Sequence, residues 1–488
     1  MNARTILFLF LASATIVRAW LAAGHEIPAE NAYQYLCSQQ PTWAYHDGPA
    51  GTAMTVRLAA LAGDSLWLLL GPAWALAASL AAWRLGIRTA GESAALWGAI
   101  GLNLLPAFNM ASMRAGPELP ALTFVLAGVS IAWDALRRQA GGVVSWAVAA
   151  LAFAAGTLFA YWAVLAALTV ACLPFLRPKT RRPTQIIGSA LIVIATTLAL
   201  LPAILWNASK NWVPIAGWTF RGLIEPNKTD ILDGLVSFFV GISPLFSLAL
   251  VWTLWRCLRA ASTQSPAMLA GVTGLVLALP AALFVWRGWA ADTMALPAAA
   301  ILLPPACALL LARPWALAAS AVAALGFTIP ITIDQISINE LQRTAAGHAL
   351  AIDERMADKL DASLFLIGGD WALASSLGYH LRKAILPPEG HPLAYRLESQ
   401  GEVDQFTYWP SYDDFVETAA PPDEVFTEQK AVNPFVGASA IYVGRESPSN
   451  LPQTLRGAFS AVELIQEVGP ENRRLYIYLC LDYQTLPL

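Results

Sequence analysis

Charged residues are scarce in this sequence. Asp, Glu, Lys and Arg make up 13% of its 488 residues, and hydrophobic residues make up 57%, whereas an ordinary soluble domain has roughly 25% charged residues. The composition therefore excludes a soluble globular fold and predicts a polytopic α-helical membrane protein. The formal net charge of -3 gives no reason to expect a nucleic-acid partner.

Cysteine is also scarce, and its pattern excludes two kinds of framework. The five cysteines show no C-x-x-C spacing, and three of them lie inside apolar segments, where cysteine behaves as a small hydrophobe. We therefore expect no metal cluster and no disulfide framework. Cys37 and Cys480 could meet in an oxidising compartment, but two unpaired thiols are the preferred interpretation.

Long apolar stretches are abundant. A helix needs about 20 apolar residues to cross a bilayer, and the run from Val143 to Phe175 is long enough for a helical hairpin, split near Tyr161 and Trp162. We expect about eleven transmembrane helices, the first of them a retained span rather than a cleaved signal peptide: 5–23, 66–85, 91–110, 118–136, 143–158, 160–176, 183–205, 234–258, 265–286, 293–312 and 314–333.

Basic residues between these spans predict their direction, because cytoplasmic loops carry an excess of Lys and Arg. Alternate loops place their basic residues on the same side as Arg4: Arg84, Arg88, Arg137, Arg138, Arg177, Lys179, Arg181, Arg182, Arg256, Arg259 and Arg313. The amino terminus is therefore expected in the cytoplasm. The loops expected on the outer face are 24–65, 111–117, 206–233 and 287–292.

The composition changes after Ile333, where acids and turn residues return and no further span appears. Short apolar runs at 363–369, 439–444 and 474–481 alternate with helical segments at 347–361 and 371–383. We expect a transmembrane domain over 1–333, with outer catalytic loops 24–65, 111–117 and 206–233, and an external α/β domain over 334–488.

The first outer loop contains an unusual polar and aromatic stretch, PAENAYQYLCSQQPTWAYHDGP, at 28–49. Aromatic and charged side chains at a membrane boundary can simply form an interfacial belt. A second outer acid, Glu118, follows Pro117 at the start of a span, where a carboxylate complements the helix dipole. Glu30 and Glu118 are nevertheless expected at the same outer level, as an active site requires.

Several cations also fall at outer positions, against the positive-inside trend. A lipid phosphate or another anionic ligand would account for them, and contact with lipid headgroups is the alternative. The outer cations are Arg57, Arg114, Arg221, Lys228 and Arg287.

These motifs resemble the bacterial branch of the protein O-mannosyltransferase-like glycosyltransferases of the GT-C fold. Their relatives include the aminoarabinose and galacturonic-acid transferases that modify lipid A. The family's first outer loop typically reads D-E-A-Y-Y-W-L-W-S-Q-x-x-A-W-G-Y-Y-D-x-P-P, and residues 30–49 read ENAYQYLCSQQPTWAYHDGP without a gap. The later family motifs T-P-D-x-P, L-P-x-x-x-W-N-x-x-x-x-W, D-R-Y-Q-x-A-S-E-L-A-F-Y-L and N-Q-Y-D-x-W-P are similar to 116–120, 201–212, 370–381 and 404–410.

The resemblance implies transfer of a sugar from a polyprenyl-phosphate donor to an acceptor hydroxyl outside the bacterial inner membrane, with inversion. Glu30 would be the general base and Glu118 would position the acceptor or share this role. The lipid phosphate would meet Arg57, Arg114, Arg221 or Arg287, and other substrate contacts would come from Tyr33, Tyr45, Asp47, Gln405, Tyr408 and Trp409. No cofactor is indicated, although a divalent cation between carboxylate and phosphate is compatible with this chemistry.

The sequence departs from the family at three positions. Glu30 and Glu118 replace aspartates, and Ala160-Tyr161 replaces a usual Lys-Tyr pair. An added methylene moves a carboxylate by about 1 Å, which can cost about a hundredfold in rate unless the backbone compensates. A catalytically degenerate relative that binds lipid-linked glycan or a partner enzyme is therefore the main alternative, and a transporter ranks lower because few polar residues lie near the bilayer midplane.

Overall fold

The computed structural model describes residues 2–24, 26–63, 65–137, 142–176, 183–215, 228–259, 266–286, 293–357, 364–397, 403–414, 416–417 and 431–485. The chain divides into two compact units. We call Met1–His25 with Pro41–Asp334 the membrane unit, and Glu26–Gln40 with Gln335–Leu488 the C-terminal unit.

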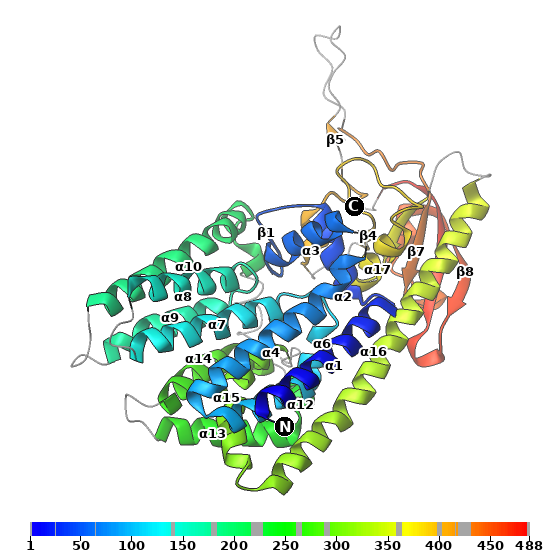
Figure 1. Ribbon diagram of the computed structural model, residues 1–488. Helices are drawn as coiled ribbons and strands as arrows, with labels where there is room; N and C mark the ends of the chain where they lie inside the picture. Colours follow the sequence, from blue (N-terminus) through cyan, green and yellow to red (C-terminus); the bar gives the residue numbers. More distant parts are fainter. Residues whose placement is uncertain are drawn as a thin grey trace, which may run out of the picture. The chain divides into compact units, whose positions relative to one another are not determined.

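The membrane unit consists mainly of apolar helices (Figure 1). They are α1 (Ala3–Gly24), α3 (Gly51–Ala62), α4 (Leu70–Thr89), α5 (Glu92–Leu104), α6 (Pro106–Ser112), α7 (Glu118–Arg137), α8 (Val143–Thr157), α9 (Ala163–Cys172), α10 (Pro183–Ser209), α12 (Lys228–Ile242), α13 (Pro244–Arg259), α14 (Pro266–Trp286), α15 (Leu296–Leu310) and the first part of α16 (Pro314–Ala357).

The prediction of a polytopic helical membrane protein is confirmed. Within the described ranges, seven helices are long and apolar enough to cross a membrane, and two bent helix pairs raise the number to nine. The other two of the eleven expected spans form the shorter apolar helices Val143–Thr157 and Ala163–Phe175, which separate near Tyr161 as expected. The first span carries exposed apolar side chains such as Phe8 and Trp20, which suit a lipid environment.

Large aromatic side chains fill the core of the membrane unit. Trp133, Trp146 and Phe153 are each at most 1% exposed, and they lie where α8 packs against α7 and α10. Gly128 and Gly188 face the Phe153 and Trp146 rings across these contacts. Small residues let helices approach closely in a membrane, where apolar burial alone does not drive their association.

Two spans are bent where proline follows the break. The axes of α5 and α6 differ by 70° at Pro106, and those of α12 and α13 differ by 93° at Pro244. Proline cannot donate the backbone hydrogen bond that would continue the preceding helix, so each break has a local cause. The first bend leads into the segment that carries Glu118.

A buried arginine stabilises the first bend. Arg18 is 5% exposed, and it donates through Nη1 to Asn103 Oδ1 at 2.7 Å and through Nη2 to Asn109 Oδ1 at 2.9 Å. Asn103 in turn donates to Ser79 Oγ at 2.8 Å. Because the carbonyl end of α5 carries partial negative charge, it favours a cation at this place. Asn103, a polar residue within an apolar span, thus has a structural role.

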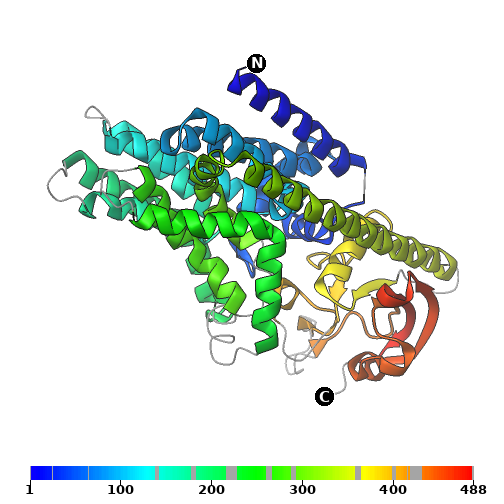
Figure 2. The same ribbon diagram turned by 90° about the horizontal axis from the view of Figure 1, so that it is seen from below.

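The sheet of the C-terminal unit confirms the expected α/β domain. Its strand order is β4-β3-β7-β9-β8, in which β4, β3 and β7 are parallel and β9 and β8 are antiparallel to their neighbours. The orange and red strands are visible in Figure 2. The bounds are β3 (Phe365–Gly368), β4 (Tyr395–Arg396), β7 (Ala440–Gly444), β8 (Phe459–Val468) and β9 (Leu475–Tyr483), and the short pair β5 (Val416–Glu417) and β6 (Ala431–Val432) lies outside this sheet.

Alternating side chains of the central strands fill two cores. Leu366 and Ile441 join the cluster that contains α16 residues such as Ala349, while Phe365 and Tyr442 join an aromatic cluster. This period of two is what a sheet buried on both faces requires. Helix α17 (Trp371–Leu381) follows β3 and packs against it.

Two features of this unit differ from the sequence expectation. The expected span 314–333 and part of the expected helix 347–361 belong to one continuous helix, α16, of 44 residues. Strand β8 was not expected, because most of its side chains are exposed and its sequence lacks an apolar alternation. In addition, residues Glu26–Gln40 belong to the C-terminal unit, although they follow the first span directly.

Candidate functional site

The first half of the outer motif forms helix α2 (Ala29–Gln39). Pro28 precedes the helix in an extended conformation, and Pro41 follows it, so proline borders both ends. Glu30 lies half-buried in the first turn, where a carboxylate complements the helix dipole. Tyr33 and Leu36 are buried on one face of the helix.

Contacts with α16 and α17 hold this segment in the C-terminal unit. Arg343 of α16 forms an ion pair with Glu26, just before α2. The Tyr33 ring meets Trp371 edge-on at a centroid distance of 5.8 Å, and Tyr35 meets Tyr379 at 5.1 Å. Aromatic pairs of this kind contribute about 0.5–1.5 kcal/mol beyond the area they bury. The aromatic spacing of the motif is therefore explained by packing against α17.

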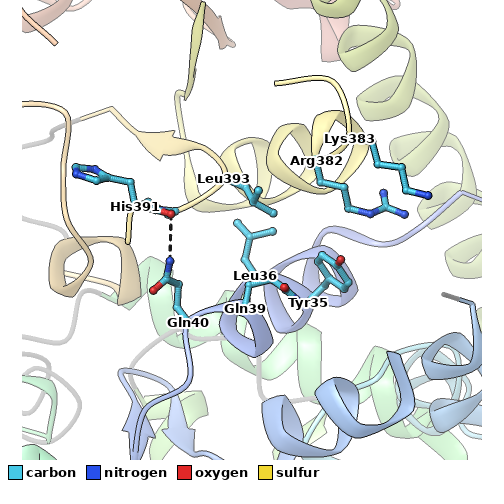
Figure 3. A pocket seen from close by; sticks show the side chains of 9 residues that line it. Tyr35, Leu36, Gln39, Gln40, Arg382, Lys383, His391 and Leu393 are labelled. Carbon is cyan, nitrogen blue, oxygen red and sulfur yellow. Dashed lines mark hydrogen bonds between the residues drawn. The ribbon is translucent and has the colours of Figure 1, made fainter. Parts of the chain in front are cut away.

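A small cavity of about 230 Å³ lies between α2, the end of α17 and the loop that follows it. Figure 3 shows that Tyr35, Arg382 and Lys383 form one end of the cavity and that Gln40 and His391 form the other. Gln40 Nε2 donates to the His391 carbonyl at 3.1 Å, which fastens the loop to the helix. The remaining lining residues are Leu36, Gln39, Pro392 and Leu393.

The electrostatics near this cavity are dominated by cations. Arg382 stacks over the Tyr379 ring at 3.9 Å and lies 5.5 Å from the centre of the Tyr35 ring. Burial, with further contributions from Arg343 and Arg382, lowers the pKa of His380 to about 4. Burial also lowers the pKa of His391, although Asp414 opposes this shift.

The second half of the motif forms a tight hairpin in the membrane unit. Strand β1 (Ala44–Tyr45) pairs with β2 (Gly48–Pro49), and His46 and Asp47 form the turn. Gly51 N donates to the Leu158 carbonyl at 2.9 Å. A Cβ atom at position 51 would lie 2.4 Å from that oxygen, so only glycine allows this approach. The hairpin therefore docks on the turn between α8 and α9.

Polar groups from three motif segments meet at this hairpin. Tyr161, from the α8–α9 turn, interacts with the Asn207 side chain of α10 and electrostatically with Asp47. The Tyr161 hydroxyl and Asn207 Oδ1 are buried, and neither makes a hydrogen bond of standard geometry within the described part of the chain. Asn207 Nδ2 is satisfied by the Ala203 carbonyl at 2.8 Å. The structure thus brings Asp47 together with two polar groups able to bind a ligand.

The other predicted residues of the membrane unit have different surroundings. Glu118 is the first residue of α7 and is half-buried, and its Oε2 lies 2.3 Å from the point where a Cβ on Gly116 would be. Glycine at 116 therefore makes room for the carboxylate. Arg114 is half-buried and Arg57 is exposed on α3. Tyr45 is buried in the hairpin.

The predicted sugar contacts of the C-terminal unit lie around a short 3-10 helix, Gln405–Tyr408. Asp404 caps this helix and forms an ion pair with Arg396 at 2.5 Å. Gln405 and Trp409 are 2% and 8% exposed, and Tyr408 is half-buried. Burial at these positions agrees with a packing role, and sugar binding by them stays a prediction.

Two predicted phosphate contacts, Arg221 and Arg287, lie outside the described residues, as does the side chain of Lys228. Glu30 belongs to the C-terminal unit and Glu118 to the membrane unit, so their joint action also stays a prediction. No group of three or more His, Cys, Asp or Glu side chains able to hold a metal ion occurs in the described ranges.

Sequence analysis missed the basic pair Arg382-Lys383 and the cavity that it lines. The pair directly follows the motif-like segment 370–381, so its position was visible. Its partners Gln39 and Gln40, however, are about 340 residues away in the sequence. Only the packing of α2 against α17 brings them together.

Comparison with known proteins gives a fold assignment. No family model and no curated protein sequence matches the chain. ArnT from Cupriavidus metallidurans in the apo state is similar over 98% of both chains, with a TM-score of 0.58 and 15% sequence identity. The chain has an ArnT-like GT-C fold.

A second structure of the same ArnT, bound to undecaprenyl phosphate, is similar over 96% of this chain and 97% of that one, with a TM-score of 0.58 and 15% sequence identity. The Archaeoglobus fulgidus oligosaccharyltransferase complexed with zinc and sulfate is less similar, with a TM-score of 0.48, 13% identity and coverage of 78% of this chain and 61% of that one. The likeness to ArnT confirms the expected GT-C architecture over almost the entire length.

Proposed function

We propose that this protein is a membrane glycosyltransferase that moves a sugar from a polyprenyl-phosphate donor to an envelope acceptor, with inversion at the anomeric carbon. The observation that carries the proposal is the likeness to ArnT over 98% of the chain, which includes both units. The undecaprenyl phosphate bound by the second ArnT structure supports a lipid-linked donor. A fold alone does not determine function, so the motif residues carry the chemistry.

In the proposed reaction, the Glu30 carboxylate accepts the proton of an acceptor hydroxyl. The acceptor oxygen attacks the anomeric carbon as the bond from that carbon to the phosphate oxygen breaks, and the electron pair leaves with the polyprenyl phosphate. General-base catalysis is typically worth about 10²–10⁴ in rate. Glu118 positions the acceptor, and Tyr33, Tyr45 and Asp47 contact the substrates.

The leaving phosphate is a weak base and needs positive charge more than a proton. Arg57, Arg114, Arg221 and Arg287 are the proposed sources of this charge. The sugar is further contacted by Gln405, Tyr408 and Trp409. This scheme requires the inner bacterial membrane, with the amino terminus in the cytoplasm and the C-terminal unit in the periplasm.

The non-catalytic alternative rests on Ala160, which stands beside Tyr161 where the similar family has lysine. A relative without that cation would bind a lipid-linked glycan and not transfer it. Purified protein supplied with radiolabelled polyprenyl-phosphate sugars and candidate acceptors separates the two functions. Label in the acceptor supports transfer, and donor binding without transfer supports the alternative.

The orientation is tested separately, because it determines the side on which the acceptor is met. Alkaline phosphatase fused after Ala357 is expected to be active in the bacterial envelope. Alkaline phosphatase fused after Arg182 is expected to be inactive. The reverse pattern would place the proposed site in the cytoplasm and overturn the envelope acceptor.

A further inference from the structure

We propose that the cavity between α2, α17 and the following loop binds a single anionic sugar residue of the acceptor. By this we mean a sugar ring that carries a phosphate or a carboxylate. This assignment deepens the proposed function. Only the statement that the sugar belongs to the acceptor rests on that function. The binding site itself depends only on the geometry of the C-terminal unit.

The size of the cavity limits its ligand. Pockets for drug-sized ligands usually measure roughly 300–1,000 Å³, and this one measures about 230 Å³. It therefore fits one ring and its substituent, and not an extended chain. Leu36 and Leu393 face each other at its middle, where they offer an apolar surface to the ring (Figure 3).

The charge of the lining determines the sign of the ligand. Arg382 and Lys383 are cations, and none of the nine described residues that line the cavity is acidic. Arg382 forms no ion pair with a carboxylate in the described part of the chain, and its Nη1 donates to the Tyr379 carbonyl at 2.5 Å. A guanidinium held in this way keeps donors for a planar or tetrahedral oxyanion.

The aromatic contacts of Arg382 fix its direction in advance. It is held over the Tyr379 ring at 3.9 Å and lies near Tyr35. Such cation–π contacts restrict the rotamers of the side chain. Less conformational entropy is therefore lost when an anion binds.

The opposite end of the cavity can bind the hydroxyls of a sugar. Gln40 lies there and donates through Nε2 to the His391 carbonyl at 3.1 Å, and Gln39 also lines the cavity. An amide both donates and accepts hydrogen bonds, as the vicinal hydroxyls of a sugar require. Anion recognition at one end and hydroxyl recognition at the other therefore suit an anionic sugar better than inorganic phosphate alone.

Binding is tested directly on the full-length protein in detergent, by titration in saturation-transfer NMR. The probes are glucose 6-phosphate, glucuronic acid, glucose and inorganic phosphate. We expect at least one anionic sugar to bind at least tenfold more tightly than glucose and than phosphate. We also expect its binding to weaken as ionic strength rises, because the attraction is electrostatic.

Substitutions connect this binding to the cavity. Arg382→Gln is expected to weaken anionic sugar binding at least tenfold, and Lys383→Gln, at the exposed rim, at least threefold. Arg355→Gln changes an exposed arginine of α16 that does not line the cavity; it is the matched control and is expected to have no effect. If Arg382→Gln does not fold, Lys383→Gln alone decides the outcome.

Equal binding of glucose and of the anionic sugars, or binding unchanged by the folded cavity variants, would overturn the assignment. If the protein binds an anionic sugar through Arg382 but transfers no sugar, the binding site is supported and the proposed function is wrong. In an active enzyme, the bound probe is expected to raise the KM for the acceptor and leave the KM for the donor unchanged. The opposite pattern would overturn the acceptor role.

Discussion

The two halves of the outer motif are held by different kinds of contact. Residues 26–40 belong to the C-terminal unit, where the Glu26–Arg343 ion pair and the aromatic pairs of Tyr33 and Tyr35 connect α2 to its neighbours. Residues 41–51 belong to the membrane unit and are held by backbone contact at Gly51. An ungapped stretch of sequence thus serves two folding units.

This difference predicts different sensitivities. The α2 half depends on side chains that reach their partners, so truncation should damage it. The hairpin half depends on an absent side chain at Gly51, so addition of atoms should damage it.

The largest effect is expected at Glu30. Glu30→Gln retains the shape of the side chain but removes the proton acceptor, so turnover should fall by about 10²-fold or more. Asp47→Asn in the hairpin half should cost less, since it is proposed to contact substrate and not to accept the proton. Both are measured as kcat with an identified donor and acceptor.

The control for this experiment is Glu340→Gln, a change at an exposed glutamate of α16. Glu30→Asp sharpens the test, because it restores the residue of the similar family but shortens the side chain. If the backbone has adapted to glutamate, this variant is also slow, and only the double change with Glu118→Asp recovers activity. Full turnover by Glu30→Gln would show that the base lies elsewhere.

The next largest effect is expected at Gly51. In Gly51→Ala the new Cβ would lie 2.4 Å from the Leu158 carbonyl oxygen, so the hairpin or the α8–α9 turn must move. Overpacking of this kind typically costs about 1–3 kcal/mol. The measurement is the thermal midpoint of the purified protein.

Gly48→Ala in the same hairpin is the matched control, since the nearest atom to its Cβ would be 4.0 Å away. We expect it to leave the thermal midpoint nearly unchanged. Equal destabilisation by the two changes would mean that the hairpin is not held by close backbone approach.

A smaller, pH-dependent effect is expected at His380 in the α17 support of α2. Its pKa is about 4 in the folded protein, against an ordinary value of 6.5. The unfolded chain therefore takes up a proton as the pH falls through 6.5, while the folded chain does so only near pH 4. The contribution of neutral His380 to the free energy of unfolding is fully present above pH 6.5 and is lost between pH 6.5 and pH 4, with ~1–2 kcal/mol lost at pH 5.

His380→Phe is expected to remove this part of the pH dependence. The difference in thermal midpoint between the variant and the unchanged protein is compared at pH 7 and pH 5, which cancels the titration of other groups. A difference that stays constant with pH would show that neither burial nor the charges of Arg343 and Arg382 lower the pKa of His380.

The sequence predicted the membrane-embedded architecture better than the site. Spans are readable because each needs a long apolar run, and the breaks at Pro106 and Pro244 did not hide them. Strand β8 was missed because its side chains are largely exposed. The cavity was missed because Gln40 and Arg382 are distant in sequence, and the division of the motif between units was missed because one continuous pattern gives no sign of a unit boundary.

The smallest change in stability is expected at Tyr161 in the hairpin half. Its buried hydroxyl makes no hydrogen bond of standard geometry within the described ranges, so Tyr161→Phe should leave the free energy of unfolding unchanged or raise it by up to about 1 kcal/mol. If the hydroxyl instead forms a hydrogen bond with the bound substrate, kcat/KM of the Tyr161→Phe variant falls by about tenfold, which corresponds to the loss of that bond. Tyr395→Phe is the contrast, because its hydroxyl bonds His391 Nδ1 at 3.0 Å and its loss should lower the thermal midpoint. A lower thermal midpoint in Tyr161→Phe would mean that this hydroxyl already has a hydrogen-bond partner without substrate. An unchanged kcat/KM would show that Tyr161 does not contact the substrate, and Asp47 and Asn207 would remain as the polar groups at the hairpin.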